Sequence, residues 1–252
     1  MLLLGGLADT GSVATILQID PTTGSVQPVG SLAVATHDAL AAALGSTVYL
    51  FGGGETVGID TVQAFGGGRS GVVGHLPEPR SDGVALTVSG RIYLVGGFNG
   101  HVVLHDVLMT SDGTTFQAIA HLPVAVRYPA VAVVGTTIYV IGGQAATGPT
   151  TTIQSVNVAD GTTKVVAQLP QPIVEASAFA LGNDVFVAGG RTGSAFRSEV
   201  DRIDLATGGL TPVASLPGPL ADASAASLGS TVYLAGGESP ARLDQILSLS
   251  GA

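Results

Sequence analysis

The stretch VYLFGGG, residues 48–54, sets four apolar or aromatic residues directly against three glycines. Near-copies of this apolar-then-Gly-Gly unit recur along the chain, with first glycines 44 to 47 residues apart. A period of this length is typical of four-stranded β-propeller blades and is too long for the shorter helical repeats. The sequence therefore predicts one all-β domain over residues 1–252, a β-propeller of about six four-stranded blades. The first glycines are Gly5, Gly52, Gly96, Gly142, Gly189 and Gly236.

Each repeat contains four short apolar segments separated by turn-forming residues. In the fourth copy these segments are residues 130–135, 136–143, 151–158 and 164–169. The sequence ADGTT, beginning at Ala159, separates the third segment from the fourth, where a hairpin needs glycine at positive φ. The pattern predicts four antiparallel strands per blade.

The first segment of each repeat is rich in small residues, as in ALAAAL at residues 39–44. Small residues are expected in the innermost strands, which crowd around the axis of a propeller. The second strand must end abruptly beside these strands, and paired glycines permit positive φ and close backbone approach there. We therefore interpret the glycines as structural.

The ends of the sequence leave the strand count short of a closed ring. The chain begins on a second strand and ends after a third, which gives six second, six third, five fourth and five first strands, or 22 in all. Six complete blades need 24. The count predicts an incomplete closing blade; the alternatives are that the sequence is part of a longer chain, or that the ring closes with irregular pairing.

Composition excludes several classes of partner. The formal net charge is −9 with a single lysine, Lys164, so the basic patch that nucleic acids or anionic membranes require is missing. No cysteine is present, which excludes disulfides and thiolate sites. No apolar run reaches the length of a spanning helix. We expect neither a nucleic-acid nor a membrane partner, and we favour an extracytoplasmic domain of a larger protein over a cytoplasmic one.

The repeat resembles that of the kelch β-propellers, in which a small-apolar strand precedes a tyrosine-bearing strand that ends in Gly-Gly. Matching residues are Tyr49-Leu-Phe-Gly-Gly and Tyr139-Val-Ile-Gly-Gly, together with the Leu76-Pro77 and Leu169-Pro170 pairs that precede the next repeat. The resemblance covers essentially the whole chain. The chain has no tryptophan, so the outer-strand packing pair of many kelch repeats is absent, as in the looser bacterial branch. The resemblance implies a kelch-like propeller that binds ligands at the mouth of its central channel.

The start of each inner strand and the Gly-Gly end of the next strand should lie at this mouth, because the two strands are antiparallel. Arginines there would hold anionic groups, carboxylates would hold hydroxyls or amines, and Tyr128 and Phe98 would offer a flat face. Glu55 also follows its Gly-Gly pair. The candidate ligand-binding residues are His37, Asp38, Arg80, Asp82, Phe98, Arg127, Tyr128, Gln144, Glu175, Arg191, Asp222 and Glu238.

The recurrence of carboxylates in one column has two interpretations. A carboxylate at a strand start commonly caps backbone N–H groups, and a repeat copies any scaffold residue. Residues that break the repeat are therefore better candidates for function, since scaffold demands are the same in every blade; they are His37, Arg80, Arg127, Tyr128 and Arg191.

Other motifs carry no function. Residues 66–71 match G-x-G-x-x-G formally, but no helix follows, so we interpret them as a turn. The sequence predicts no cofactor, no metal ion and no catalytic residue.

We expect a non-catalytic binding or sensing module for a small polar molecule, a sugar or a peptide. The alternative is a sugar-modifying enzyme of the sialate-mutarotase type, which the resemblance implies and which would use Glu175 with Arg127. A pure scaffold is the third possibility.

Overall fold

The computed structural model describes residues 1–54 and 59–250, and this part of the chain consists of strands and connecting segments without a helix. It therefore contains no helix that could cross a membrane. The chain forms two compact units, residues 1–119 and 120–252. The prediction that residues 1–252 are one domain stays a prediction.

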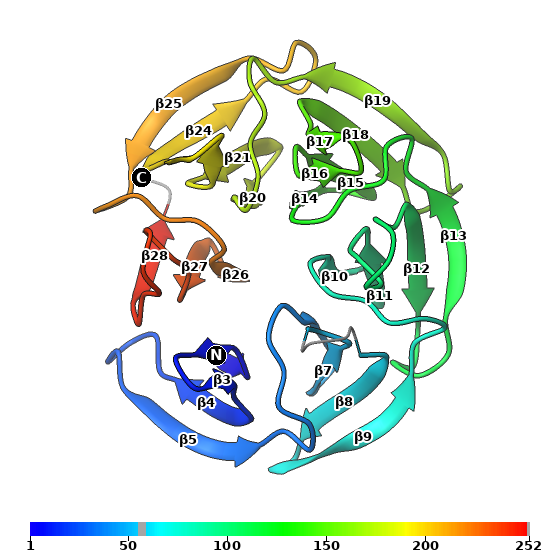
Figure 1. Ribbon diagram of the computed structural model, residues 1–252, viewed down its shortest axis with the longest axis vertical. Coiled ribbons are helices and arrows are strands. Elements are labelled where there is room, and N and C mark those ends of the chain that lie inside the picture. Colours follow the sequence, from blue (N-terminus) through cyan, green and yellow to red (C-terminus); the bar gives the residue numbers. More distant parts are fainter. Residues whose placement is uncertain (55–58, 251–252) are drawn as a thin grey trace. The chain divides into compact units, whose positions relative to one another are not determined.

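The first unit contains three antiparallel sheets, each with its strands in chain order (Figure 1). The last strand of the third sheet runs across the boundary between the two units. The sheets are β1 (Leu2–Leu4), β4 (Thr15–Ile19) and β5 (Val26–Ser31); β6 (Leu40–Leu44), β7 (Thr47–Phe51), β8 (Thr61–Gly66) and β9 (Arg69–His75); and β10 (Val84–Val88), β11 (Arg91–Val95), β12 (Asp106–Thr110) and β13 (Gln117–His121).

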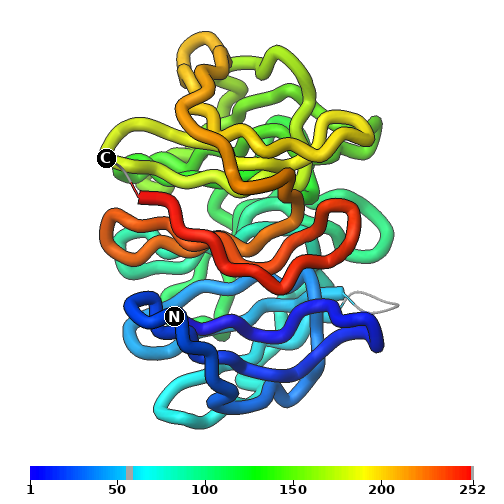
Figure 2. The backbone as a smooth tube through the Cα atoms, turned by 90° about the vertical axis from the view of Figure 1, so that its left-hand side faces the viewer, coloured from blue at the N-terminus to red at the C-terminus, as the bar shows by residue number. Residues whose placement is uncertain are grey.

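The second unit also contains three antiparallel sheets in chain order. Figure 2 shows β27 and β28 of its last sheet, in orange and red, running along one another. The sheets are β14 (Ala130–Val134), β15 (Thr137–Ile141), β18 (Thr152–Asn157) and β19 (Thr163–Gln168); β20 (Ser177–Leu181), β21 (Asp184–Ala188), β24 (Glu199–Ile203) and β25 (Leu210–Ser215); and β26 (Ser224–Leu228), β27 (Thr231–Ala235) and β28 (Ile246–Ser250).

These six sheets are the blades of a β-propeller, which confirms the predicted fold class. Within the described residues the predicted shortfall of two strands falls on two blades. The β1 sheet begins with the strand that is second in the other blades, and the β28 sheet ends with the strand that is third. The β1 sheet therefore lacks the first strand of a blade, and the β28 sheet lacks the fourth.

Among the described residues, three blades carry a short hairpin that the repeat pattern did not predict. We call these hairpins fingers; each follows a Gly-Gly pair, between the second and third strands of its blade. A two-residue strand is too short to show the alternation that reveals strands in a sequence. The fingers are β2 (Leu7–Ala8) with β3 (Gly11–Ser12), β16 (Gln144–Ala145) with β17 (Gly148–Pro149), and β22 (Arg191–Thr192) with β23 (Ala195–Phe196).

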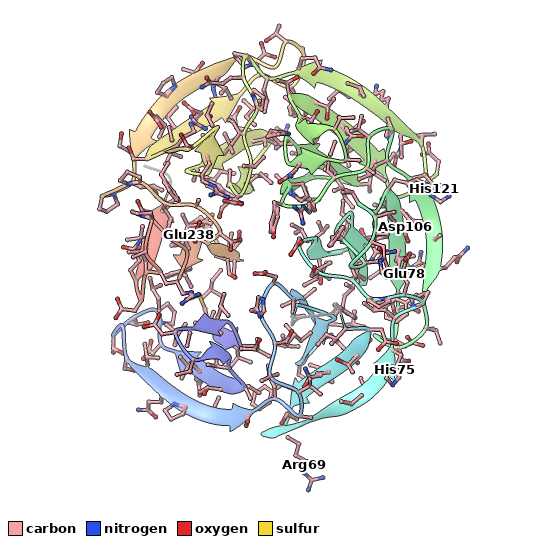
Figure 3. The ribbon with its side chains drawn as sticks, in the orientation of Figure 1. Arg69, His75, Glu78, Asp106, His121 and Glu238 are labelled. Atoms are coloured by element: carbon pink, nitrogen blue, oxygen red, sulfur yellow. The ribbon has the colours of Figure 1, made fainter. Side chains whose placement is uncertain are left out.

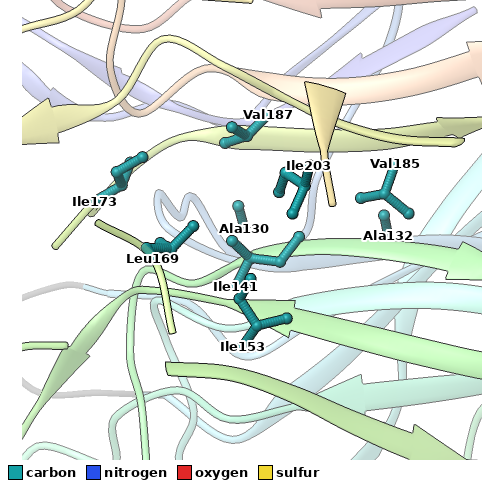
Figure 4. Close-up of a cluster of buried hydrophobic side chains, with 9 residues drawn as sticks. All are labelled: Ala130, Ala132, Ile141, Ile153, Leu169, Ile173, Val185, Val187 and Ile203. Carbon is teal, nitrogen blue, oxygen red and sulfur yellow. The ribbon is translucent and has the colours of Figure 1, made fainter. Parts of the chain in front are cut away.

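The core lies between adjacent blades. In the second unit Ala130, Ile141 and Ile153 of one blade pack in the same cluster as Val187 and Ile203 of the next (Figure 4). The leucines of three Leu-Pro pairs belong to such clusters, and Leu76, Leu169 and Leu216 are each 4% exposed. Burying one aliphatic side chain of this size stabilises the fold by about 1.5–3 kcal/mol.

The paired glycines end the second strand where the next blade comes close. The N–H of Gly53 donates to the carbonyl of Arg80 at 2.8 Å, and Gly143 donates to Ile173 at the same distance. A Cβ at Gly52 would lie 2.1 Å from the Arg80 carbonyl oxygen, where no side chain fits. Gly52 and Gly53 also have φ of 61° and 112°. The predicted structural role is confirmed, and the backbone that approaches is the loop of the following blade.

Aspartates close four of the turns between third and fourth strands, namely Asp20, Asp112, Asp160 and Asp204. Asp112 accepts a hydrogen bond from the Thr115 hydroxyl at 2.7 Å and from the N–H groups of Thr114 and Thr115. These donors hold the pKa of the Asp112 carboxyl well below its usual value. The pKa of Asp204 in the corresponding turn is lowered as well, chiefly by the N–H of Ala206. The turn predicted within residues 66–71 is confirmed, since Gly67 and Gly68 connect β8 to β9.

Candidate functional site

The residue before each inner-strand entry faces the residue that follows Gly-Gly. Each pair forms an isolated antiparallel bridge. The start of the first strand and the Gly-Gly end of the second strand therefore lie together in each of these blades. The bridges are His37 with Gly54, Ser81 with Phe98, Arg127 with Gln144, Val174 with Arg191, and Ala221 with Glu238.

The next residue along the chain adopts a left-handed backbone in all five repeats. These residues are Asp38, Asp82, Tyr128, Glu175 and Asp222, with φ between 52° and 59°. Aspartate tolerates this conformation better than most residues because its short side chain can bond locally. The recurrent aspartates are therefore explained by the backbone, in line with the scaffold interpretation.

Backbone hydrogen bonds connect this column from blade to blade. The N–H of Asp82 donates to the carbonyl of Asp38 at 3.0 Å in the first unit. In the second unit Glu175 donates to Tyr128 at 3.2 Å, and Asp222 donates to Glu175 at 2.8 Å. Tyr128 and Glu175 thus occupy a left-handed backbone position that aspartate or asparagine adopts more readily. A large side chain in this conformation is strained by about 1–3 kcal/mol, and such strain clusters at functional sites.

Arg80 lies in the interior, which does not fit the predicted role of holding a ligand. Its side chain is fully buried, with one nitrogen 2.8 Å from both carboxylate oxygens of Asp106 and another 2.7 Å from the Gly96 carbonyl. The equivalent residues of other repeats are also buried, among them Val126 and Ile173. The column is therefore a core column, in which Arg80 binds the strand end of its own blade.

Arg197 has a similar role that sequence reasoning missed. From the loop after the β22–β23 finger it donates to the carbonyl of Gly189, the first glycine of its blade, and to Asp201 on β24. The sequence signal was an Arg-x-x-x-Asp spacing, which on an extended strand would put the two Cα atoms about 13 Å apart and therefore did not indicate a contact. Both buried arginines thus satisfy a carbonyl at a Gly-Gly pair.

In the first unit the remaining candidates make short local contacts. A hydrogen bond of 2.7 Å joins the His37 ring to the hydroxyl of Ser12 on the β2–β3 finger, and the Asp38 carboxylate lies 3.7 Å from the other ring nitrogen. Asn99, beside Phe98, donates to Glu78 at 2.6 Å. Asp82 is buried, whereas Asp38 is exposed. Glu55 lies outside the described residues.

The second unit brings three predicted residues into one cluster. The Nη2 group of Arg191 donates to Oε1 of Glu175, and its Nη1 lies 3.8 Å from Oε1 of Glu238. The guanidinium also lies 5.5 Å from the ring centroid of Phe196, on the other strand of its finger. We call Glu175, Arg191 and Glu238 the acidic-arginine cluster. It joins the entry of one blade, a finger and the Gly-Gly end of the next blade.

This cluster contains hydrogen-bonding groups that the protein leaves unused. Oε2 of Glu175 and Nε of Arg191 are both shielded from solvent, and no hydrogen-bond partner for either exists among the described residues. The Glu175 side chain is only 9% exposed, whereas that of Arg191 is 31% exposed. An unsatisfied buried polar atom costs about 1–3 kcal/mol, so such atoms require an explanation.

Arg127, Tyr128 and Gln144 lie at the entry and the finger of the preceding blade. The Arg127 guanidinium lies 5.2 Å from the Tyr128 ring centroid, and Arg127 bridges Gln144 through the backbone. Arg191 contacts Glu175, and the pairing of Glu175 with Arg127 that the sequence suggested stays a prediction. Asp222 is exposed in the following column.

The charged residues on the outer strands lie away from the candidate site residues. Figure 3 shows Arg69 extending from the end of β9 and His121 at the outer side of β13. His75 pairs with Asp60 at 3.1 Å on exposed surface. Residues 1–54 and 59–250 contain no group of three or more His, Asp or Glu side chains placed to hold a metal ion.

Six antiparallel meanders with paired glycines at their second strands define a kelch-like β-propeller. The family model described as Kelch motif matches residues 79–109, and this match together with the fold supports a kelch-repeat propeller. A solved structure described as that of YjhT is similar, with a TM-score of 0.81 and 12% sequence identity over 98% of this chain and 94% of that chain. At this identity the likeness concerns the fold alone. No curated protein matches the sequence.

Proposed function

We propose that the protein is a non-catalytic binding module that recognises a small polar molecule, a sugar or a peptide segment through the acidic-arginine cluster. The observation that carries the proposal is the pair of unused groups, Oε2 of Glu175 and Nε of Arg191. Groups left unpaired in a folded protein are poised to bond a ligand, because the ligand then recovers the free energy that burial costs.

Backbone strain supports the same location. Glu175 keeps φ at 57° although an aspartate or asparagine would fit with less strain, and Tyr128 keeps φ at 52° in the same column. The fold alone gives no reason for either side chain. Arg127, Gln144 and Asp222 provide further polar groups on neighbouring entries and fingers, as a site for a polar molecule requires.

A thermal-shift screen tests the proposal. Neutral hexoses, uronic acids, amino sugars and dipeptides are added to the wild-type protein, and hits are confirmed by titration calorimetry. A ligand at 100 times its dissociation constant adds about 2.7 kcal/mol to the unfolding free energy. We expect at least one class to raise the melting temperature. If none does, the proposal is wrong and the scaffold interpretation stands.

Paired variants assign the binding to the cluster. Glu175→Gln removes the charge with little change in size. It should weaken binding of the confirmed ligand about tenfold or more. Glu199→Gln is the matched control, since Glu199 is half-exposed on β24 and lies 3.6 Å from Arg197. The control should bind as the wild type does; equal binding by Glu175→Gln would place the ligand elsewhere.

A second candidate function is a sugar-modifying enzyme of the sialate-mutarotase type. The observation that favours it is a buried carboxylate with one unused oxygen on a strained backbone. Mutarotation opens and recloses a sugar ring. As the bond between the anomeric carbon and the ring oxygen breaks, Glu175 would take the proton of the anomeric hydroxyl, the ring oxygen would take a proton from water, and the reverse transfers would reclose the ring, while Arg127 holds the sugar carboxylate.

Turnover distinguishes the two functions. The interconversion of N-acetylneuraminate anomers is followed by NMR with wild-type protein, Glu175→Ala and Arg127→Ala. An enzyme accelerates the exchange, and Glu175→Ala abolishes the acceleration while sugar binding persists. A binding module leaves the exchange rate at its uncatalysed value, and the variants change binding alone.

A further inference from the structure

The ion pair between Arg191 and Glu175 uses only half of its bonding capacity. An arginine and a carboxylate can form two parallel hydrogen bonds, which is the stronger arrangement. Here Nη2 of Arg191 meets Oε1 of Glu175, while Nε and Oε2 of the same two planar groups have no partner among the described residues. The cluster thus presents one donor and one acceptor beside an ion pair that is already formed.

A hydroxyl is the simplest group that satisfies both atoms together, and a primary amide also carries the donor and the acceptor that they need. A hydroxyl can donate to Oε2 of Glu175 and accept from the Nε–H of Arg191. A carboxylate can only accept and an ammonium can only donate, so each would leave one of the two atoms unsatisfied. Both atoms are themselves shielded from solvent, so the partly exposed Arg191 side chain has to shift for a hydroxyl to reach them.

The charge of the cluster also favours an uncharged ligand. The guanidinium of Arg191 lies between two carboxylates, since Glu175 contacts it and Glu238 is 3.8 Å away. Arg191 is thereby neutralised, and the cluster retains an excess of negative charge. This charge opposes a ligand carboxylate, although the sequence alone suggested that Arg191 would hold an anionic group.

We propose that the ligand of this cluster is an uncharged polyol, such as a neutral sugar, held by one hydroxyl that bridges Glu175 and Arg191. This inference rests on the proposed binding function and narrows its ligand class. Thr192 is not part of the bridge: its Oγ1 is also unpaired, but successive side chains of a strand point to opposite faces.

Matched sugars test the hydroxyl bridge without any variant. The probes are the methyl glycosides of glucose, galactose and mannose, their deoxy and O-methyl derivatives at each position, and the corresponding uronic acids. At one ring position we expect both the deoxy and the O-methyl derivative to bind about tenfold more weakly, because an O-methyl group accepts but cannot donate. The uronic acid should also bind at least tenfold more weakly than the neutral sugar. Binding is measured by titration calorimetry.

The outcomes separate this inference from the function on which it rests. Equal binding by all deoxy derivatives, or tighter binding of the uronic acids, overturns the hydroxyl bridge and leaves the binding function intact. If no probe and no compound of the wider screen binds, the binding function itself fails.

Two conservative variants give an independent readout. Arg191→Lys keeps the positive charge but removes the Nε donor, so it should remove most of the difference between the parent sugar and its deoxy derivative. Arg202→Lys is the control, since Arg202 is half-exposed on β24 and lies 3.9 Å from Asp184. Glu238→Gln should narrow the preference for the neutral sugar over the uronic acid. A Glu238→Gln variant with unchanged preference would contradict the charge argument.

Discussion

Two arginine–carboxylate pairs, Arg80 with Asp106 and Arg191 with Glu175, show how similar chemistry serves different purposes. Arg80 is fully buried, bonds both oxygens of its carboxylate and also binds the Gly96 carbonyl. Arg191 is one-third exposed, and its carboxylate keeps one oxygen unused. Arg80 leaves its Nε unpaired as well, but no ligand can reach it. Burial and the use of both carboxylate oxygens, rather than the presence of an arginine, distinguish a scaffold pair from a candidate site.

The largest expected difference between the two pairs is in stability. Arg80→Met should lower the free energy of unfolding by about 3–5 kcal/mol, because it leaves the largely buried Asp106 charge without its partner. Arg191→Met should cost less, about 1–3 kcal/mol, since Arg191 is 31% exposed, although it also leaves the buried Glu175 carboxylate without its partner. Denaturant unfolding of both variants measures the difference.

A double variant sharpens this result. Arg80→Met with Asp106→Leu removes both charges and should recover much of the lost stability. Equal losses for Arg80→Met and Arg191→Met would remove the distinction between the pairs.

The next effect concerns the backbone that positions Arg80. Gly52→Ala should destabilise the protein by about 3 kcal/mol or more, since its Cβ would lie 2.1 Å from the Arg80 carbonyl oxygen at a φ of 61°. Gly45→Ala is the matched comparison, because Gly45 has φ of 62° but a Cβ there would meet no atom within 4 Å. It should cost about 1 kcal/mol. Denaturant unfolding compares the two variants, and equal losses would show that close approach contributes nothing beyond φ.

The smallest expected effect comes from the outer turns and depends on pH. The pKa of Asp112 is lowered in the folded protein, so the unfolded chain takes up a proton at higher pH. Its stabilising contribution is complete above the ordinary aspartate pKa of about 3.8 and is lost as pH falls below it. Asp112→Asn should therefore flatten the fall in melting temperature between about pH 4 and pH 2. An unchanged pH profile would assign the acid sensitivity to other carboxylates.

The blades and their glycines could be predicted from the sequence because they depend on patterns of neighbouring residues. The spacing of Gly-Gly pairs, the small residues of β6 and the aspartate-glycine turns each show their pattern within a few residues. It did not reach the fingers, since β22 and β23 have only two residues each. It also placed Arg80 among the ligand-binding candidates, because no pattern in one sequence tells a buried arginine from an exposed one.

The sequence by itself determined the repeat, the fold class and the end of each blade at which polar side chains gather. A period of this length and paired glycines leave the backbone few alternatives, so these features were already specified along the chain. Only the tertiary structure decided which charges meet: Arg80 with Asp106 are 26 residues apart in the chain, and Arg191 with Glu175 are 16 apart. Such pairs form only when strands and fingers have folded against each other, and burial then fixes which of their polar atoms stay unused.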